Sequence, residues 1–319
     1  MKAIRVQTFG GEEVLELVEC DTPSPEAGEV LIRVSAIGVN PVETYIRAGA
    51  YPLLPPLPYT PGGNMAGTVI GCGAGVEQWL PGDRVYSAST RTGAYAEYAV
   101  CAADQVFPLP DIISFQQGAA LGIPAATAWR GLFIRGGGRT GERVLVHGAS
   151  GSVGQAALQM ARAAGMEVYG TAGTDEGLSL LQQLGARVAF NHRNQGYVEE
   201  MKEKVAGGFD LILEMLANVN LERDLDLLAP KGRVVIIGSR GRIEIDPRAT
   251  MGKETDIRGL SGFACTSEEM ARTYRAIGLA LEDGSLVPIV SREMPLAKAP
   301  EAHRLVMQSG NCGKIVLIL

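Results

Sequence analysis

Few residues in this sequence are of the kinds that build metal centres and disulfide frameworks. The 319 residues include three histidines and five cysteines. No two cysteines form a CxxC pair, their number is odd, and none of the histidines stands at metal-ligand spacing from a cysteine. We therefore expect free thiols in a reducing compartment, with neither a disulfide framework nor a bound metal ion.

Long apolar runs and an excess of positive charge are also absent. No apolar run reaches the ~18 residues of a membrane span, and no signal-peptide pattern opens the sequence, so we expect a cytoplasmic protein. Lys and Arg total 29 against 35 Asp and Glu, and the net charge of −6 argues against a broad nucleic-acid interface. The composition is otherwise that of a globular protein long enough for two domains.

Residues 142–165 carry the clearest structural pattern. An apolar run at 144–146 predicts a buried strand, glycines follow at 148, 151 and 154, and a helical pattern leads to a second strand at 168–170. In such a βαβ unit the glycines let the backbone approach a pyrophosphate, and the helix N-terminus binds its charge. Ala149 replaces the first glycine of GxGxxG, so the turn alone is also compatible with a strand–helix connection that binds nothing. The flanking strands favour dinucleotide binding.

The order of predicted elements divides the chain. Predicted strands dominate up to residue 107, a helical pattern with an expected break at Pro124 covers 114–135, and strands and helices then alternate to residue 260. This alternation predicts an α/β fold with a doubly wound parallel sheet of about six strands, the last at 256–260. A helix is expected at 267–283. The apolar run 313–319 is too short for a separate domain, so we expect it to rejoin the N-terminal one.

A proline-rich stretch at 38–67 predicts a long loop with a short helix at 43–47. A loop of this length in a compact domain is often functional. Asn40 and Tyr45 are its polar candidates. Alternatively, Tyr45 packs as an amphipathic aromatic side chain whose hydroxyl is satisfied locally.

Four segments together give a more specific signal: NPVETYIR at 40–47, HGASGSVG at 147–154, EMLANVNL at 214–221 and GSRG at 238–241. With them the chain resembles the zeta-crystallin family, the zinc-free NADPH:quinone oxidoreductases of the medium-chain dehydrogenase/reductase superfamily. The resemblance implies a GroES-like β-rich catalytic domain from residues 1–117 and 260–319, and a Rossmann domain at 118–259. It also implies NADPH in the cleft, reduction of quinones, ortho-quinones included, and a homo-oligomer, either a dimer or a tetramer.

The zinc-dependent members of that superfamily differ at two positions. Asn40 and Gly63 stand where those members place a cysteine and the histidine of a GHE motif, and the lobe with four clustered cysteines is missing. An alcohol dehydrogenase mechanism, in which zinc polarises an alkoxide, is therefore unsupported. We expect His147 to orient the glycine turn or fill a strand end, and not to bind metal.

The predicted second strand of the Rossmann domain bears on the choice of cofactor. Domains that prefer NAD carry an acid at its end, whereas here the end reads Gly170-Thr171-Ala172-Gly173. Asp175 and Glu176 follow, but a helix first turn capped by Thr174 explains them. His192 and Arg193, after the third strand, are the nearest basic residues, so NADPH is favoured. The resemblance implies that NADPH is lined by Asn40, Tyr45, Ser150, Gly151, Ser152, Val153, Gly173, His192, Asn220, Ile237, Gly238, Ser239 and Arg240.

A quinone accepts hydride readily, so little acid–base machinery is required. Tyr45, with an unperturbed pKa of ~10, could donate a proton or hydrogen bond to the quinone oxygen. Asn40 could bond the nicotinamide carboxamide, the quinone or a water molecule. The alternatives are an NADPH-dependent alkenal or enone reductase on the same fold, a cofactor-binding protein without turnover, and an AU-rich RNA-binding role, which the acidic balance disfavours.

Overall fold

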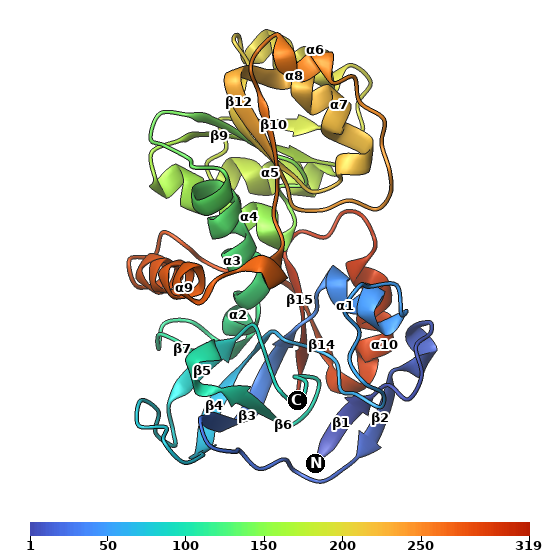
Figure 1. Cartoon of the computed structure of the whole chain (residues 1–319), viewed down its shortest axis with the longest axis vertical. Helices are drawn as coiled ribbons and strands as arrows, with labels where there is room; N and C mark the ends of the chain where they lie inside the picture. The colour runs from blue at the N-terminus through green and yellow to red at the C-terminus, as the bar shows by residue number, and fades with distance from the viewer. The chain divides into compact units, whose positions relative to one another are not determined.

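The computed structural model describes all 319 residues, except for the side chain of Phe263. The chain divides into two compact units, drawn in Figure 1. Unit 1 contains Met1–Ile123 and Pro288–Leu319, and unit 2 contains Pro124–Val287. Unit 2 is therefore inserted into the sequence of unit 1.

Unit 1 is built around a seven-stranded sheet of order β14-β15-β3-β4-β5-β7, with β6 paired to β3, and β1 and β2 form a separate small sheet. The C-terminal strand is antiparallel to β3, with Leu317 opposite Ile37, which confirms that the last residues rejoin the N-terminal part. Side chains from both parts share one apolar core. The strands are β1 (Lys2–Arg5), β2 (Glu16–Glu19), β3 (Glu29–Gly38), β4 (Met65–Cys72), β5 (Arg84–Ser87), β6 (Tyr98–Ala102), β7 (Val106–Pro108), β14 (Val290–Pro295) and β15 (Lys314–Ile318).

Short helices complete unit 1. The expected helix in the proline-rich loop is α1 (Pro41–Arg47), which begins at a proline because a first-turn residue needs no N–H. The predicted helix at 114–135 divides into α2 (Phe115–Ala119), α3 (Gly122–Trp129) and the π-helical η3 (Arg130–Arg135). Only α2 lies wholly in unit 1, because unit 2 begins at Pro124. The break precedes Pro124, because that proline lies in the first turn of α3, where it is tolerated. The other helices of unit 1 besides α1 and α2 are α10 (Ala299–Val306), η1 (Glu12–Val14), η2 (Ala103–Gln105) and η5 (Leu296–Lys298).

Unit 2 is a Rossmann fold. Its six strands lie in the order β10-β9-β8-β11-β12-β13, and each pairs in parallel with its neighbours. Counted along the chain, this is the doubly wound order 3-2-1-4-5-6, with its switch point between β8 and β11. The six predicted strands are confirmed. They are β8 (Arg143–Val146), β9 (Glu167–Ala172), β10 (Val188–Asn191), β11 (Phe209–Glu214), β12 (Leu228–Ile236) and β13 (Asp256–Gly259).

Amphipathic helices connect these strands. In α4, for example, Ala157, Leu158 and Ala161 are all completely buried, at the helical spacing expected of a face packed on the sheet. The helices of unit 2 are α4 (Ser152–Ala163), α5 (Asp175–Gln183), α6 (Tyr197–Lys204), α7 (Ala217–Leu227), α8 (Arg248–Met251) and α9 (Ser267–Glu282), with the short η4 (Gly262–Ala264).

Residues 260–287 lie in unit 2, although the resemblance predicts that they belong to the catalytic domain. Two sets of polar contacts hold them there. The buried Arg130 guanidinium donates to the Ser261 carbonyl at 2.8 Å and pairs with Glu269 at 3.1 Å. The amide of Gln159 exchanges two hydrogen bonds with the Val287 backbone. The helix α9 is thus an extension of the Rossmann unit, and the chain re-enters unit 1 at Pro288.

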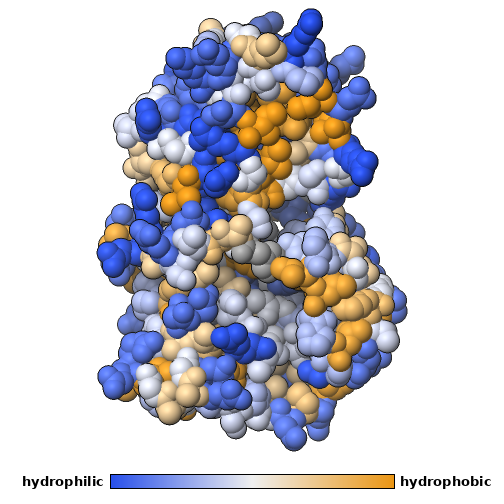
Figure 2. Space-filling view, in the orientation of Figure 1, coloured by the Kyte–Doolittle hydropathy of each residue, from blue (hydrophilic) through white to orange (hydrophobic). Residues whose placement is uncertain are grey.

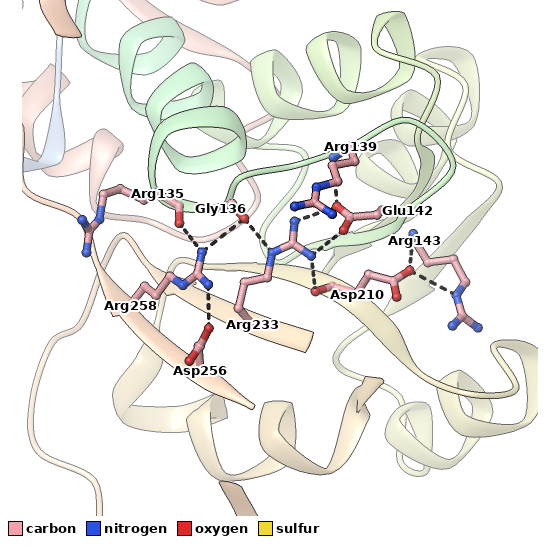
Figure 3. Close-up of polar contacts among 9 residues, drawn as sticks. All are labelled: Arg135, Gly136, Arg139, Glu142, Arg143, Asp210, Arg233, Asp256 and Arg258. Carbon is pink, nitrogen blue, oxygen red and sulfur yellow. Dashed lines mark hydrogen bonds and ion pairs between the residues drawn. The ribbon is translucent and has the colours of Figure 1, made fainter. Parts of the chain in front are cut away.

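An arginine network closes the end of the unit 2 sheet at which the strands begin (Figure 3). On β12, Arg233 donates to both carboxylate oxygens of Glu142, at 2.9 and 2.6 Å, and to the backbone oxygens of Gly136 and Asp210. The Asp210 carboxylate accepts the backbone N–H of Arg143. Arg233 is only 6% exposed, so these bonds replace the water that its guanidinium loses on folding.

Hydrophilic side chains dominate the visible face of unit 2, although Figure 2 also shows one area where hydrophobic side chains gather. Val219, Met251 and Ile257 are among the large apolar side chains that unit 2 exposes. A bilayer-spanning helix is not found in the part of the chain that the structure describes.

Candidate cofactor and substrate site

The glycine turn after β8 is fixed by its neighbours in the sheet. The backbone N–H of His147 donates to the Leu213 carbonyl at 3.0 Å, and that of Ala149 donates to the Thr171 carbonyl at 2.8 Å. The Ala149 methyl is completely buried, and a Cβ placed on Gly170 would lie only 2.8 Å from it. The first glycine of the usual motif is therefore replaced by a methyl group that occupies the space Gly170 leaves.

The three glycines of the turn have different roles. Gly148 has a positive φ of 56°, which favours glycine. A Cβ on Gly154 would lie 2.5 Å from Ala149 Cα, so this glycine permits the helix to pack on the turn. A Cβ on Gly151 would meet only the Gly148 carbonyl, at 3.4 Å, and Gly151 is the N-cap of α4. Gly151 thus leaves open the space in front of the first-turn N–H groups, where an anion fits.

Two basic side chains lie over the end of β9. A Cβ on Gly173 would come within 2.7 Å of His192 Nε2 and 3.0 Å of Arg193 Nε, so the imidazole and the guanidinium both approach this glycine. Burial lowers the pKa of His192, and His147 and Arg193 lower it further. Thr174 caps α5 by accepting the Gly177 N–H, as the sequence predicts. The end of β9 therefore offers cationic and hydrogen-bonding groups and no carboxylate.

The remaining predicted cofactor residues of unit 2 follow β11 and β12. Asn220 lies in the first turns of α7, and its amide donates to Glu214 at 3.3 Å. The segment Ile237–Arg240 follows β12. It is held by the Ile237 N–H, which donates to the Glu214 carbonyl, and by the Arg240 N–H, which donates to Asn218 Oδ1. Because parallel strands end at one edge, unit 2 brings all its predicted residues to the carboxyl edge of its sheet.

In unit 1, Asn40 is locked in place. It is 3% exposed. Its Nδ2 donates to the Gly38 carbonyl at 3.1 Å and to Glu43 Oε1 at 2.9 Å, and its Oδ1 accepts from Lys314 Nζ at 2.5 Å. Both amide hydrogens are therefore used within unit 1, and only one acceptor lone pair of Asn40 remains.

A buried polar network surrounds Asn40. The Glu43 carboxylate accepts the Tyr95 hydroxyl at 2.8 Å, and that hydroxyl lies 3.1 Å from His303 Nε2. Burial raises the pKa of Glu43, lowers that of His303 to about 3, and lowers that of Lys314 to about 8 although Glu43 opposes this. The His303 ring is thus neutral and donates from Nε2 to the tyrosine oxygen. The network joins α1 to the C-terminal segments of unit 1.

Tyr45 lies on α1 and is half-buried. Its carbonyl accepts the Ala50 N–H at 2.9 Å, which closes the end of the helix. Part of the residue is exposed. Its role in catalysis stays a prediction.

The two positions that hold zinc ligands in related dehydrogenases do not suit a metal here. A Cβ on Gly63 would lie 2.5 Å from the Ala88 carbonyl oxygen, so the backbone leaves no room for a histidine. At the other position, the amide of Asn40 is engaged by Glu43 and Lys314. Among the described residues, the one group of three side chains close enough together to hold a metal ion is instead His147, Glu214 and Asp224 in unit 2.

Sequence reasoning missed several of these residues. Glu43, Tyr95, His303 and Lys314 are far apart along the chain, and nothing in their spacing brings them together. The sequence does carry a signal for Glu214. This residue directly follows the apolar residues Leu211-Ile212-Leu213, and a carboxylate is unusual at the end of a buried strand.

Comparisons with known proteins agree with this architecture. Residues 26–111 match the family model of the alcohol dehydrogenase GroES-like domain, and residues 152–277 match that of zinc-binding dehydrogenases. The chain is 50% identical to the quinone oxidoreductase of Rattus norvegicus over 100% of its own length and 98% of the relative's. The structure of Escherichia coli quinone oxidoreductase complexed with NADPH is 30% identical, with a TM-score of 0.90 and full coverage of both chains. A CurK enoyl reductase structure is 26% identical, with a TM-score of 0.90, and covers 99% of this chain and 98% of its own.

A GroES-like sheet unit formed from both ends of the chain, with an inserted Rossmann sheet, defines a medium-chain dehydrogenase/reductase. The fold class expected from the sequence is thereby confirmed. Within that class, the chain belongs to the quinone oxidoreductase family.

Proposed function

We propose that this chain is a zinc-independent NADPH:quinone oxidoreductase. The observation that carries the proposal is the full-length match to quinone oxidoreductases at 50% identity. Two features of the structure support it. The end of β9 lacks the acid that would repel a 2′-phosphate, and Gly63 has no space for a zinc-ligating side chain.

NADPH is held in this proposal by the carboxyl edge of the unit 2 sheet. Ser150, Gly151, Ser152 and Val153 would hold the pyrophosphate at the start of α4, where the helix dipole favours negative charge. His192, with Arg193 beside it at Gly173, takes the 2′-phosphate. Asn220 and the segment Ile237–Arg240 line the rest of the cofactor. Asn40 contributes at most an acceptor, because its N–H groups are used.

When bound, NADPH would supply a hydride from C4 of its nicotinamide for transfer to a quinone. The chain itself has to hold the acceptor in contact with that carbon and exclude water. We propose that the Tyr45 hydroxyl donates a hydrogen bond to a quinone oxygen, where negative charge develops. The buried network around Glu43 keeps α1, and with it Tyr45, in position.

Oxidation of NADPH and NADH, each offered ortho-quinones, para-quinones and enones, tests the proposal. We expect quinone-dependent oxidation with a clear preference for NADPH, unchanged after treatment with a chelator, and no stoichiometric zinc by elemental analysis. Activity that collapses with the chelator and returns with zinc would contradict the zinc-independent mechanism. Cofactor binding without turnover of any acceptor would show that the chain is a cofactor-binding protein without enzymatic activity.

Reduction of activated alkenals or enones is the second candidate function. The observation that favours it is the similarity of fold to the CurK enoyl reductase. Both reactions begin with hydride transfer from the same cofactor, so the acceptor specificity in the same assay separates them. Faster turnover of enones than of quinones would favour this alternative.

We also propose a homo-oligomer. β13 has a single neighbour, β12, so its other edge is unpaired within the chain, and Ile257 on this strand is 38% exposed. An open strand edge with an exposed apolar residue pairs readily with a second copy. Sedimentation velocity measures whether a dimer or tetramer forms.

Replacing Tyr45 with phenylalanine separates chemistry from packing. We expect nearly unchanged NADPH affinity and a roughly 5- to 150-fold lower kcat/KM, the effect of losing a hydrogen bond to a charge-bearing oxygen of about 1–3 kcal/mol. Stopped-flow kinetics and fluorescence titration give both quantities. Tyr98→Phe, on β6 of the same unit, is the control and should change neither. An unaltered kcat/KM in Tyr45→Phe would remove the hydroxyl from the reaction.

A further inference from the structure

Three ionisable side chains are buried directly beneath the glycine turn of unit 2. His147 follows β8, Glu214 ends β11, and Asp224 lies on α7, and they are 4%, 0% and 0% exposed. His147 Nε2 lies 2.8 Å from Asp224 Oδ1 and 3.5 Å from Glu214 Oε2. The proposed cofactor-binding role of the turn does not use these side chains, so their burial needs another explanation.

The charges of this triad do not balance unless it holds an extra proton. An imidazolium neutralises one carboxylate, and a second buried carboxylate would then be uncompensated, which is costly. Glu214 Oε2 and Asp224 Oδ2 are both buried, and neither accepts a hydrogen bond from any donor among the described side chains. A proton shared between the two carboxyls satisfies both oxygens and makes the triad neutral.

A metal ion fits the triad less well than a proton. Two ligands of one tetrahedral zinc ion, each about 2.0 Å from the metal, lie roughly 3.3 Å apart. The 2.8 Å between His147 Nε2 and Asp224 Oδ1 is instead a hydrogen-bond distance. The geometry therefore indicates a direct hydrogen bond between His147 and Asp224, and not ligation of a common metal ion.

The other oxygen of Glu214 is bonded to a residue of the proposed cofactor site. Its Oε1 accepts the backbone N–H of Leu216, at the start of α7, and the side-chain amide of Asn220 at 3.3 Å. Because this oxygen is an acceptor, Nδ2 of Asn220 must face Glu214. Oδ1 of Asn220 is then left to accept a hydrogen bond from a donor such as a ribose hydroxyl or a carboxamide N–H.

The same triad reaches the glycine turn. The Thr171 hydroxyl accepts the Gly148 N–H at 3.0 Å and lies 3.5 Å from His147 Nδ1. His147 is also the residue immediately before Gly148. A change in the charge of the triad therefore acts within one residue of the turn that is proposed to hold the pyrophosphate.

We propose that His147, Glu214 and Asp224 are positioning residues that share protons, orient Asn220 as an acceptor, and make NADPH affinity depend on pH. The proposal rests on the NADPH-binding function proposed above. Besides one another, the charged groups that act on the triad are Arg223, beside Asp224 on α7, and His192, at the end of β10.

The direction of the pH effect follows from the order in which the triad loses its protons. Burial raises the pKa of Glu214 to about 7, although His147 lowers it. Burial also lowers the pKa of His147, but Asp224 and Glu214 outweigh this and raise it to about 9. Raising the pH from 6.5 to 8.5 therefore removes the shared proton first and leaves net negative charge beneath the turn. This charge repels a pyrophosphate, so we expect affinity to fall with rising pH.

Glu214→Gln is the decisive variant, because glutamine keeps an acceptor for Leu216 and Asn220 and imitates the protonated acid. NADPH affinity is measured by fluorescence titration between pH 6.5 and 8.5. We expect wild-type affinity to fall about tenfold, the equivalent of one pKa unit, and Glu214→Gln affinity to change less than about twofold. NADH, which lacks the 2′-phosphate, is titrated in parallel, so that ionisation of that phosphate and of His192 is not mistaken for the triad.

Glu199→Gln, on the exposed face of α6, is the control and should keep the wild-type pH profile. Asp224→Asn is a second variant should Glu214→Gln fail to fold, and it should flatten the profile in the same way. A folded Glu214→Gln protein with the wild-type pH slope would overturn the proposal, as would wild-type affinity that does not vary with pH.

Unfolding of the cofactor-free protein distinguishes failure of this proposal from failure of the proposed function. The folded pKa values of Glu214 and His147 are raised, so their contribution to stability is complete below the unfolded pKa values and is lost as pH rises through about 7 and about 9. We expect the wild-type Tm to fall more steeply than that of Glu214→Gln over this range. If no nicotinamide cofactor binds at any pH, the proposed function fails. Parallel Tm curves would overturn the proton-sharing triad itself.

Discussion

Gly151→Val should lose NADPH affinity by about 100-fold or more while the protein still folds. The backbone at this position, with φ −77° and ψ 167°, is extended and accommodates valine. A Cβ there meets no protein atom closer than the Gly148 carbonyl, at 3.4 Å, so the protein has room for the start of a side chain in front of the α4 N-terminus. That is where the pyrophosphate would accept hydrogen bonds from the helix. A valine that fills this space would therefore remove several charge-assisted hydrogen bonds together.

Gly154→Ala is the matched variant for this test. Its methyl would lie 2.5 Å from Ala149 Cα, so we expect lower thermal stability and not a selective loss of binding. Fluorescence titration with NADPH and circular dichroism melting of both variants give the comparison. Unchanged affinity in a folded Gly151→Val protein would contradict the assignment of the phosphate turn.

Glu142→Ala should destabilise unit 2 by about 3–5 kcal/mol, the range for removing one partner of a buried ion pair. Its carboxylate receives two bonds from the Arg233 guanidinium, whose side chain is 8% exposed. Without Glu142, that cation keeps only backbone carbonyls as partners. For a unit of this size the effect corresponds to a fall in Tm of roughly 6–20 °C, measured by calorimetry.

The exposed pair of Arg187 and Glu167 is the control for that experiment. Its ionic groups lie 2.7 Å apart, but the two side chains are 62% and 41% exposed. Solvent screens such a pair, so Glu167→Ala should cost less than about 1 kcal/mol. Equal effects of the two substitutions would show that the network of Figure 3 contributes no more than a surface contact.

Local pattern was enough to predict the elements of unit 2 and the return of the last strand to unit 1. Each βαβ unit is formed by contiguous residues, such as the apolar run, glycine turn and helix of β8 and α4. Burial of the apolar faces of these strands and helices favours one parallel sheet. The place of 260–287 was not predictable in this way, because it depends on the reach of Arg130 and Gln159 across more than a hundred residues of sequence.

The candidate site also has a part that could be predicted from local motifs and a part that could not. Ser150–Val153, Gly173 and His192 stand in motifs that can be recognised one at a time, although their contact with cofactor stays a prediction. The His147, Glu214 and Asp224 triad was not predictable, because its members come from separate elements and only the assembled sheet and helix bring their polar atoms within 4.8 Å of one another. The engagement of Asn40 by Lys314 depends on pairing between the two ends of the chain.

The position of β15 in the sequence sets an order of events during synthesis. Its five residues, Lys314–Ile318, pair with both β3 and β14 and carry the ammonium group that binds Asn40. The ribosome makes them only after all of unit 2, whose residues are contiguous. Unit 2 can therefore fold while it is being made. The first 123 residues must instead wait with an open sheet edge on β3, and the segment that bears Tyr45 acquires its final support when the last strand arrives.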